Sequence, residues 1–281
     1  MQRLIVVLLL TTLVAAAGSF QSRWIGGLPL FALCALWAMS IQWLAFVPSY
    51  LKRTEVYYDL VGSLTFLSVM ALLLLVGGAR DGRSLLLAVM VSVWAMRLGS
   101  FLFARVRRDG SDSRFDKLKH MPLAFFTTWS MQGMWVLVTA APAIATMSSN
   151  QPQPLTALDA LAVLIWAAGF GIEVSADRQK TRFREQFGAE DFIRTGWWAH
   201  SRHPNYFGEI TLWVGVSLLA LPVLQGWQYL TLLSPVLSWF LLTRVSGIPL
   251  LEKKADRRWG EDPQYQAYKE ATPVLVPRLF K

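Results

Sequence analysis

Eight long apolar runs constrain what this chain can fold into more than any other feature. They cover residues 4–20, 27–47, 59–77, 84–104, 122–145, 155–175, 206–222 and 228–243. A helix needs about 20 apolar residues to cross roughly 30 Å of hydrocarbon, and each run approaches that length, although the last two are short. The chain is 54% hydrophobic and only 16% charged, which leaves little room for a soluble domain. We therefore predict an all-α polytopic membrane helix bundle of seven or eight transmembrane helices, with 1–281 as a single integral membrane domain.

Positive charges fall almost entirely on alternate loops. If the N-terminus lies inside, 23 of the 27 Lys and Arg residues belong to inner segments, three belong to outer loops, and Arg97 lies within a run. The positive-inside rule predicts this asymmetry for that orientation, with a cytoplasmic C-terminus. The net charge of +9 is then mainly a topology signal, so we expect no nucleic-acid partner.

The first run leaves one alternative open. Residues 1–21 combine a basic residue, an apolar core and a small-residue stretch at 15–18. This pattern is also typical of a cleavable signal peptide, whose removal would leave seven spans and every later orientation unchanged. We favour a retained helix.

The chain has too few Cys and His residues to predict disulfide bonds or a metal site. Cys34 is the single Cys and lies inside an apolar run, so a disulfide framework is not available. The three His residues are His120, His200 and His203, which are too scattered for a convincing metal cluster. We expect no metal.

Polar residues first gather at the end of the run 155–175. Glu173, Asp177 and Lys180 share one face at helical spacing. A helix that leaves the membrane with a solvated, salt-bridged end would explain them, so spacing alone does not decide whether they bind a ligand.

The segment 194–209 is harder to explain as a plain helix end. Pro204 suits the first turn of the next helix, and Asn205 and Glu209 then lie four residues apart on one face. A carboxylate at the mouth of a membrane helix is expensive and is a functional candidate by default. An interfacial aromatic belt from Trp197 and Trp198 would explain the tryptophans, but it does not explain Asn205 with Glu209.

Arg97 is the charge that lies inside a run. An intramembrane Arg needs an anionic partner or a water-filled cavity. Arg97 and Arg108 lie on roughly one helical stripe that faces the inner side, and more Lys and Arg residues follow residue 176. Together they predict a cationic pocket for a phosphorylated cofactor or a lipid headgroup. The basic stretch 249–260 is explained adequately as an amphipathic interfacial helix.

Three stretches together resemble the C-terminal domain of the steroid 5α-reductase superfamily, and most closely its uncharacterised bacterial membrane-protein branch. The stretches are residues 176–180, residues 201–209 with Trp213, and Glu252 with Trp259, Gly260, Tyr268, Val276 and Pro277. The resemblance covers roughly 50–281, which we take as a reductase-like core. Sterol Δ14-reductases and isoprenylcysteine carboxyl methyltransferases share its Arg-His-Pro-x-Tyr centre, here residues 202–206.

The resemblance implies a cytoplasmic polar chamber in the helix bundle that holds NADPH. It puts Asn205, Glu209 and Trp213 near the nicotinamide. The residues implied to contact the adenosine and phosphate portions are Arg97, Arg108, Asp177, Arg194 and Tyr268. The other motif residues that we assign to cofactor binding are Lys180, His203, Tyr206 and Glu252.

The first half of the chain departs from the reductase pattern at the substrate end. Steroid 5α-reductases place a Tyr and a Gln-Glu pair around the substrate carbonyl, but the segment 93–96 contains no Tyr and no Gln-Glu pair precedes it. We expect Tyr58 and Asp59, together with Glu209, to be the catalytic residues. Tyr57 and Glu55 are further substitutes at the same inner mouth.

Three hypotheses follow. The first is a bacterial inner-membrane oxidoreductase that uses NADPH to reduce a carbon–carbon double bond conjugated to a carbonyl, in a lipophilic steroid-like or isoprenoid substrate from the bilayer. The second is a membrane methyltransferase that uses S-adenosylmethionine. The third is a non-catalytic protein that binds membrane lipids through its basic inner face. Charge favours the first over the second, because NADPH carries phosphates whereas the methyl donor carries a positive sulfonium.

Overall fold

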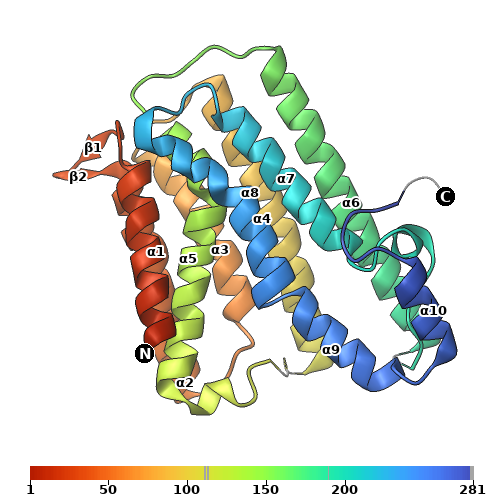
Figure 1. The fold of residues 1–281 in the computed structure, drawn as a ribbon. Helices are drawn as coiled ribbons and strands as arrows, with labels where there is room; N and C mark the ends of the chain where they lie inside the picture. Colours follow the sequence, from red (N-terminus) through yellow and green to blue (C-terminus); the bar gives the residue numbers. More distant parts are fainter. Residues whose placement is uncertain (111, 113, 189, 279–281) are drawn as a thin grey trace. The chain divides into compact units, whose positions relative to one another are not determined.

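The computed structural model describes residues 1–110, 112, 114–188 and 190–278, and most of these residues are helical (Figure 1). The elements of the first half are α1 (Gln2–Gly18), β1 (Trp24–Ile25), β2 (Leu28–Pro29), α2 (Leu30–Leu51), α3 (Tyr58–Leu75), α4 (Gly82–Asp109), the 3₁₀ turn η1 (Leu118–His120) and α5 (Pro122–Met147). Those of the second half are α6 (Ala157–Phe187), η2 (Gly196–Ala199), α7 (Pro204–Ala220), η3 (Gly226–Leu233), α8 (Ser234–Phe240), η4 (Leu241–Val245), α9 (Ile248–Trp259) and α10 (Pro263–Ala271).

The predicted all-α membrane bundle is confirmed. Five helical segments of the described chain are long and apolar enough to cross a membrane: Leu30–Leu51, Tyr58–Leu75, Gly82–Arg108, Ala157–Phe187 and Gly226–Trp259. The helix α1 is apolar but shorter. Helices also occupy the predicted runs 122–145 and 206–222, as α5 and α7. The protein is therefore a multi-pass membrane protein, and the total of seven or eight spans stays a prediction.

The last predicted run, 228–243, is not one regular helix. It begins as the 3₁₀ helix η3, continues as the short α-helix α8, and ends in the π-helical turn η4. Pro235 lies at the second residue of α8, where its missing N–H costs no helical hydrogen bond. The change of helix type therefore falls where a continuous α-helix would have lost a backbone bond.

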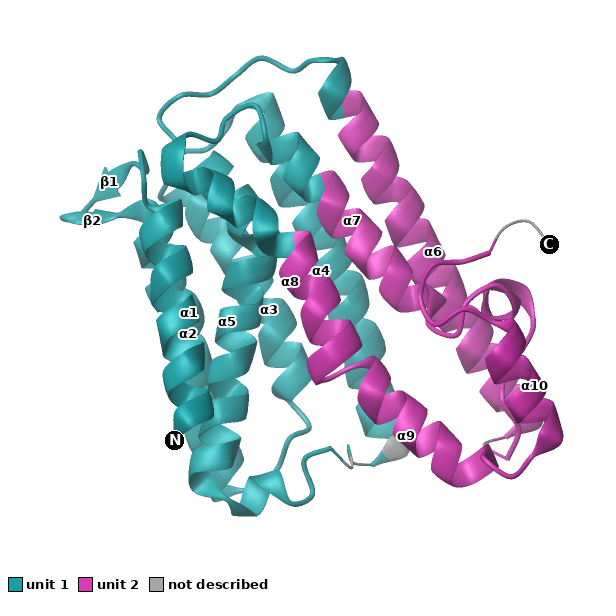
Figure 2. Ribbon diagram, in the orientation of Figure 1, with its two compact units in different colours: residues 1–159, 216–234 teal, residues 160–215, 235–281 magenta. Residues whose placement is uncertain are grey.

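The chain forms two compact units, each of which is described by itself (Figure 2). Unit 1 comprises residues 1–159 and 216–234, and unit 2 comprises residues 160–215 and 235–281. The reductase-like core expected at 50–281 therefore contributes to both units. Whether the chain acts as a single domain stays a prediction.

In unit 1, α5 is the central helix. It packs against α1, α2, α3 and α4, and from Val136 to Met147 every side chain is buried. The C-terminal half is rich in alanine, which lets neighbouring helices approach closely, as is common in membrane bundles. Gly133, before this half, also permits a close approach, since a Cβ atom there would lie 2.6 Å from the sulfur of Met39 on α2.

Arg83 is buried in unit 1, although its position in the sequence suggested an outer-loop cation. Its guanidinium donates to both carboxylate oxygens of Asp159 and to the carbonyls of Gln153 and Pro154, at 2.7–3.1 Å. The side chains of Arg83 and Asp159 are 0% and 4% exposed. This ion pair connects the start of α4 to the start of α6 and the loop before it. Arg83 is therefore a buried, hydrogen-bonded residue and not an exposed surface cation.

In unit 2, α6 and α7 approach through glycines. A Cβ atom on Gly208 would lie 2.6 Å from both the carbonyl oxygen of Gly169 and the backbone nitrogen of Glu173. About two turns further along α7, a Cβ atom on Gly215 would meet the backbone of Trp166 at 2.7 Å. The two helices therefore touch backbone to backbone, which brings their polar faces together at the start of α7.

Candidate functional site

Buried carboxylates gather where α6 and α7 meet in unit 2. Glu173 and Asp177 lie one turn apart on α6 and are 3% and 6% exposed, and Glu209 on α7 is 8% exposed. The amide of Asn205 donates to Oδ1 of Asp177 at 3.1 Å, so the two helices exchange a side-chain hydrogen bond as well as backbone contact. Ionisable side chains are rare inside membrane proteins and are functional candidates by default, so this concentration of acid groups marks a candidate site.

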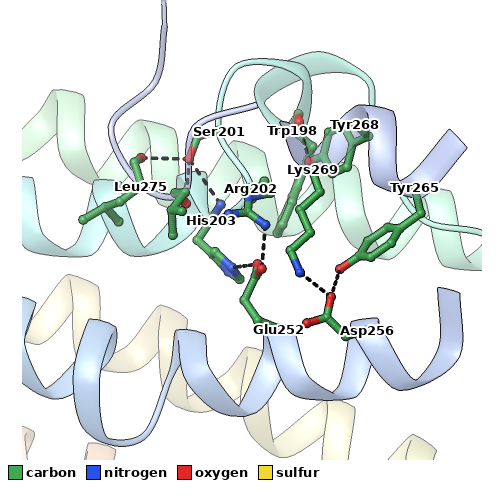
Figure 3. Close-up of polar contacts among 11 residues, drawn as sticks. Trp198, Ser201, Arg202, His203, Glu252, Asp256, Tyr265, Tyr268, Lys269 and Leu275 are labelled. Carbon is green, nitrogen blue, oxygen red and sulfur yellow. Dashed lines mark hydrogen bonds and ion pairs between the residues drawn. The ribbon is translucent and has the colours of Figure 1, made fainter. Parts of the chain in front are cut away.

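Glu252 on α9 accepts hydrogen bonds from two consecutive residues that precede α7 (Figure 3). Arg202 donates from Nη1 to Oε2 of Glu252 at 2.6 Å, and Nε2 of His203 lies 2.7 Å from Oε1. The ring of His203 also stacks on that of Tyr206, with centroids 5.8 Å apart. This arrangement fixes the loop that leads into α7 relative to α9.

The contact with Glu252 also sets the protonation of His203. Because a carboxylate can only accept, Nε2 of His203 carries the hydrogen. Burial lowers the pKa of His203 below its usual 6.5, against the opposing effects of the hydrogen bond and charge of Glu252. At neutral pH the imidazole is therefore uncharged and its Nδ1 is an acceptor. Among the described residues, neither Nδ1 of His203 nor Nε of Arg202 has a hydrogen-bond partner, and both atoms are buried.

The two tryptophans just before α7 contact α6. Trp198 is 4% exposed and donates from Nε1 to the carbonyl of Ala176, while Trp197 donates to the hydroxyl of Ser175. The ammonium of Lys180 lies 4.4 Å from the Trp198 ring centroid, a cation–π contact. The N–H groups of both tryptophans therefore have partners inside the protein, and their position relative to a membrane interface stays a prediction.

The C-terminal segment holds the same loop from the other direction (Figure 3). The hydroxyl of Tyr268 on α10 donates to the carbonyl of Trp198 at 2.7 Å. Beyond α10, the carbonyl of Leu275 accepts from Ser201 at 2.7 Å, and the carbonyl of Pro273 accepts from the backbone nitrogen of Arg202 at 2.9 Å. Tyr268 and the chain that follows α10 thus position the 196–203 loop.

The structure brings part of the predicted cofactor set together within unit 2. Asp177 contacts Asn205, and His203 contacts both Glu252 and Tyr206. Glu209 and Trp213 are buried further along α7. Arg194 instead donates to the side chain of Gln264 at 2.6 Å and lies over the ring of Phe192. Lys180 and Tyr268 both contact Trp198, Lys180 at its ring and Tyr268 at its carbonyl.

The remaining predicted residues belong to unit 1. Arg97 lies over the ring of Phe101, with its guanidinium carbon 5.1 Å from the centroid, and Arg108 is exposed near the end of α4. Because each unit is described by itself, whether these two arginines join the unit 2 residues in one chamber stays a prediction.

The two catalytic candidates of unit 1 are both engaged in local contacts. The hydroxyl of Tyr58 donates to the carbonyl of Thr128 at 3.0 Å. The carboxylate of Asp59 lies 3.8 Å from Arg114 and 4.0 Å from Arg105. For Tyr58 to donate its proton to a substrate, the hydrogen bond from its hydroxyl to the Thr128 carbonyl would first have to break.

Glu55, a further candidate donor, has a structural role that the sequence did not reveal. It is 4% exposed and accepts from the backbone nitrogen of Asp112 at 3.0 Å and from Lys119 at 3.3 Å. Burial acts to lower the pKa of Lys119, but the hydrogen bond and charge of Glu55 outweigh it and raise that pKa. Glu55 thus anchors the segment between α4 and α5. Tyr57, the other substitute, is 53% exposed.

These features define a class: an all-α, multi-pass membrane protein with a buried polar site between helices. The chain belongs to the DUF1295 family, described as a protein family of unknown function, whose model matches residues 43–272. The members are uncharacterised membrane proteins related to steroid 5-alpha-reductase-like proteins. No match was found among curated proteins or among solved structures.

Proposed function

We propose that the protein is an NADPH-dependent reductase that acts on a carbon–carbon double bond conjugated to a carbonyl in a lipophilic substrate taken from the bilayer. We place it in the bacterial inner membrane with its C-terminus in the cytoplasm, and in the steroid 5α-reductase superfamily. The observation that carries the proposal is the buried polar site in unit 2, where Asn205 bonds to Asp177 beside Glu173 and Glu209. Polar groups of this kind inside a membrane protein point to a ligand.

The donor set of unit 2 fits the ribose and amide portions of such a cofactor. Nε of Arg202 is a buried donor and Nδ1 of His203 a buried acceptor, both without partners among the described residues, so each is available to a hydrogen-bonding group of a ligand. Carboxylates accept from ribose hydroxyls or from a carboxamide N–H. Further along α6, Arg178, Arg182 and Arg184 supply positive charge of the kind that phosphates need.

In this mechanism each residue has a limited task. Bound NADPH would supply the hydride. Asn205 and Glu209 would hold the carboxamide and ribose and so fix which ring face meets the substrate, and a side-chain acid, with Tyr58 or Asp59 as the candidates, would hydrogen-bond the substrate carbonyl as negative charge develops on it. The neutral His203, oriented by Glu252, would accept a hydroxyl hydrogen at Nδ1.

A second candidate, a methyltransferase that uses S-adenosylmethionine, is favoured by one observation. The site contains three buried carboxylates, Glu173, Asp177 and Glu209, which suit a positively charged sulfonium better than they suit phosphates. The superfamily resemblance at residues 202–206 includes methyltransferases as well as reductases.

Calorimetry on the detergent-purified chain separates these candidates. NADPH should bind more tightly than NADH, because only NADPH presents an extra phosphate to the Arg and Lys residues, and more tightly than S-adenosylmethionine. Tight binding of S-adenosylmethionine with no NADPH binding would favour the methyltransferase. Binding of none of the three by a folded protein would contradict both enzymatic proposals.

A further inference from the structure

The helix α9 carries opposite charges on opposite faces. Glu252 and Asp256, one turn apart, point toward the loop before α7 and toward α10, where both carboxylates are hydrogen-bonded within unit 2 (Figure 3). The same face continues with Trp259, which donates to the carbonyl of Glu190 and contacts Phe192. The acidic face is thus the one that fastens α9 to the protein.

The basic face of α9 is turned to the outside. Lys253, Lys254 and Arg257 follow at helical spacing, and all three are exposed. Leu250 begins the same face one turn earlier and is 50% exposed. Within the described part of the chain, none of the three cations forms an ion pair, a hydrogen bond or a contact with an aromatic ring. Other cations near α9 differ, since Arg258 pairs with Glu190 and Lys269 with Asp256.

The position of this basic face along the chain points to a membrane surface. The segment Gly226–Trp259, which includes α9, is apolar and long enough to cross a membrane. Its α8 and η4 parts expose apolar side chains up to Val245, which is 44% exposed, and the basic face of α9 begins only two turns later. A helix with exposed leucine beside exposed lysine and arginine is typical of one that lies in the interface between headgroups and acyl chains.

We infer that Lys253, Lys254 and Arg257 bind the phosphate groups of anionic membrane lipids, with Leu250 and Leu251 set into the acyl boundary. Charge complementarity identifies the lipid class, since three unpartnered cations attract an anionic headgroup and gain little from a zwitterionic one. The apolar residues on the first turn of α9 favour a lipid over a soluble anion. This inference does not depend on the proposed reductase activity.

The test measures lipid binding to the full chain in neutral detergent. Native mass spectrometry resolves each bound lipid, with phosphatidylglycerol as the anionic probe and phosphatidylcholine as the zwitterionic probe. We expect tighter binding of phosphatidylglycerol to the wild type, and roughly tenfold to hundredfold weaker binding to K253Q/K254Q/R257Q, because each cation near a membrane surface contributes about fivefold. The variant K253R/K254R/R257K, which keeps the charges, should bind as the wild type does.

A matched control separates a local site from general charge. K52Q/R53Q/K117Q removes the same charge from exposed positions of unit 1, and its phosphatidylglycerol affinity should change by less than threefold. Equal loss in both triple variants would overturn the inference, as would wild-type affinity in K253Q/K254Q/R257Q. Displacement of the lipid by millimolar inorganic phosphate would also overturn it, because the site would then be one for soluble anions. All six positions are exposed, and the pair K254Q/R257Q serves if the triple variant is unstable.

Discussion

At the scale of single residues, the contact between His203 and Glu252 determines the chemistry available at the start of α7. The carboxylate fixes the imidazole tautomer and ring orientation, as it does in many enzyme sites that use a neutral histidine. Arg202 neutralises the same carboxylate, so the group carries no uncompensated charge. A neutral His203 with a free Nδ1 lone pair can accept a hydrogen bond but cannot donate one at that atom.

The lowered pKa of His203 predicts a pH dependence of folding stability. Between the folded pKa and the usual value of 6.5, the unfolded chain binds the proton and the folded chain does not. The stabilisation of the folded state that comes from the lowered pKa of His203 is therefore complete above about pH 6.5, and it is lost as the pH falls below that value. Melting temperatures in detergent should fall between pH 7.5 and pH 5.5 more steeply for the wild type than for His203→Gln, which keeps a donor toward Glu252.

The exposed His120 provides the control for this measurement. His120→Gln should leave the wild-type slope of melting temperature against pH unchanged. A His203→Gln protein with the same slope as the wild type would show that the imidazole takes up a proton equally well in both states.

At the scale of elements, the glycine contacts between α6 and α7 position the polar site. Gly208→Ala places a methyl group 2.6 Å from two backbone atoms that cannot rotate away, so the helices must separate. We expect a loss of about 1–3 kcal/mol in the free energy of unfolding, together with weaker ligand binding. Chemical denaturation in detergent and ligand titration measure the two effects.

Gly171→Ala is the matched control, because a Cβ atom there meets nothing within 4 Å. Alanine favours a helix over glycine by about 1 kcal/mol, so this variant should be neutral or slightly more stable. If both substitutions had the same effect, close approach of α6 and α7 would not be the reason for glycine at 208.

Breaking the buried ion pair between Arg83 and Asp159 should lower the free energy of unfolding substantially. Asp159→Asn leaves a buried guanidinium without its counter-charge, which costs about 3–5 kcal/mol of unfolding free energy. The exposed pair Arg258–Glu190 should contribute less than about 1 kcal/mol, because Glu190 is 90% exposed. Unfolding curves of Asp159→Asn and Glu190→Gln test the difference, and equal losses would contradict the structural role given to Arg83.

The sequence predicted elements better than it predicted contacts between them. The helices follow the apolar runs closely, because membrane insertion requires length and hydropathy that can be read locally. The irregular segment η3–α8–η4 was missed, since apolar content does not distinguish helix types. The burial of Arg83 was missed because its partner Asp159 lies 76 residues away in the sequence, and no local sequence pattern predicts that the two residues pair.

The candidate site was predicted in part for the same reason. Asn205, Glu209 and Asp177 were found because polar residues in or beside apolar helices are conspicuous, and the structure brings Asn205 and Asp177 together. Arg202 was named only within the 202–206 motif and was given no role of its own, although it pairs with Glu252, because an Arg beside a membrane helix is common. The role of Glu55 depends on a loop contact with Lys119 that the sequence does not specify.

At the scale of the whole molecule, the charge distribution predicts the orientation in the membrane. Reporter fusions after Lys119, Arg184 and Lys281 should give cytoplasmic signals, and a fusion after Gln151 should give a periplasmic one. A periplasmic signal at Lys281 would contradict the orientation, and with it the cytoplasmic position of the polar site.

The most direct measurement of the central claim is the affinity of Glu209→Gln for NADPH. Gln keeps the shape and one acceptor but loses the charge, and each charge-assisted hydrogen bond lost is worth about 1.5–3 kcal/mol, or roughly 10- to 150-fold in affinity. Glu185→Gln is the control, because Glu185 is an exposed acid near the end of α6 and should leave affinity unchanged. We predict that a folded, monodisperse Glu209→Gln protein binds NADPH at least tenfold more weakly than the wild type. Wild-type affinity in that variant would contradict a cofactor site at Glu209.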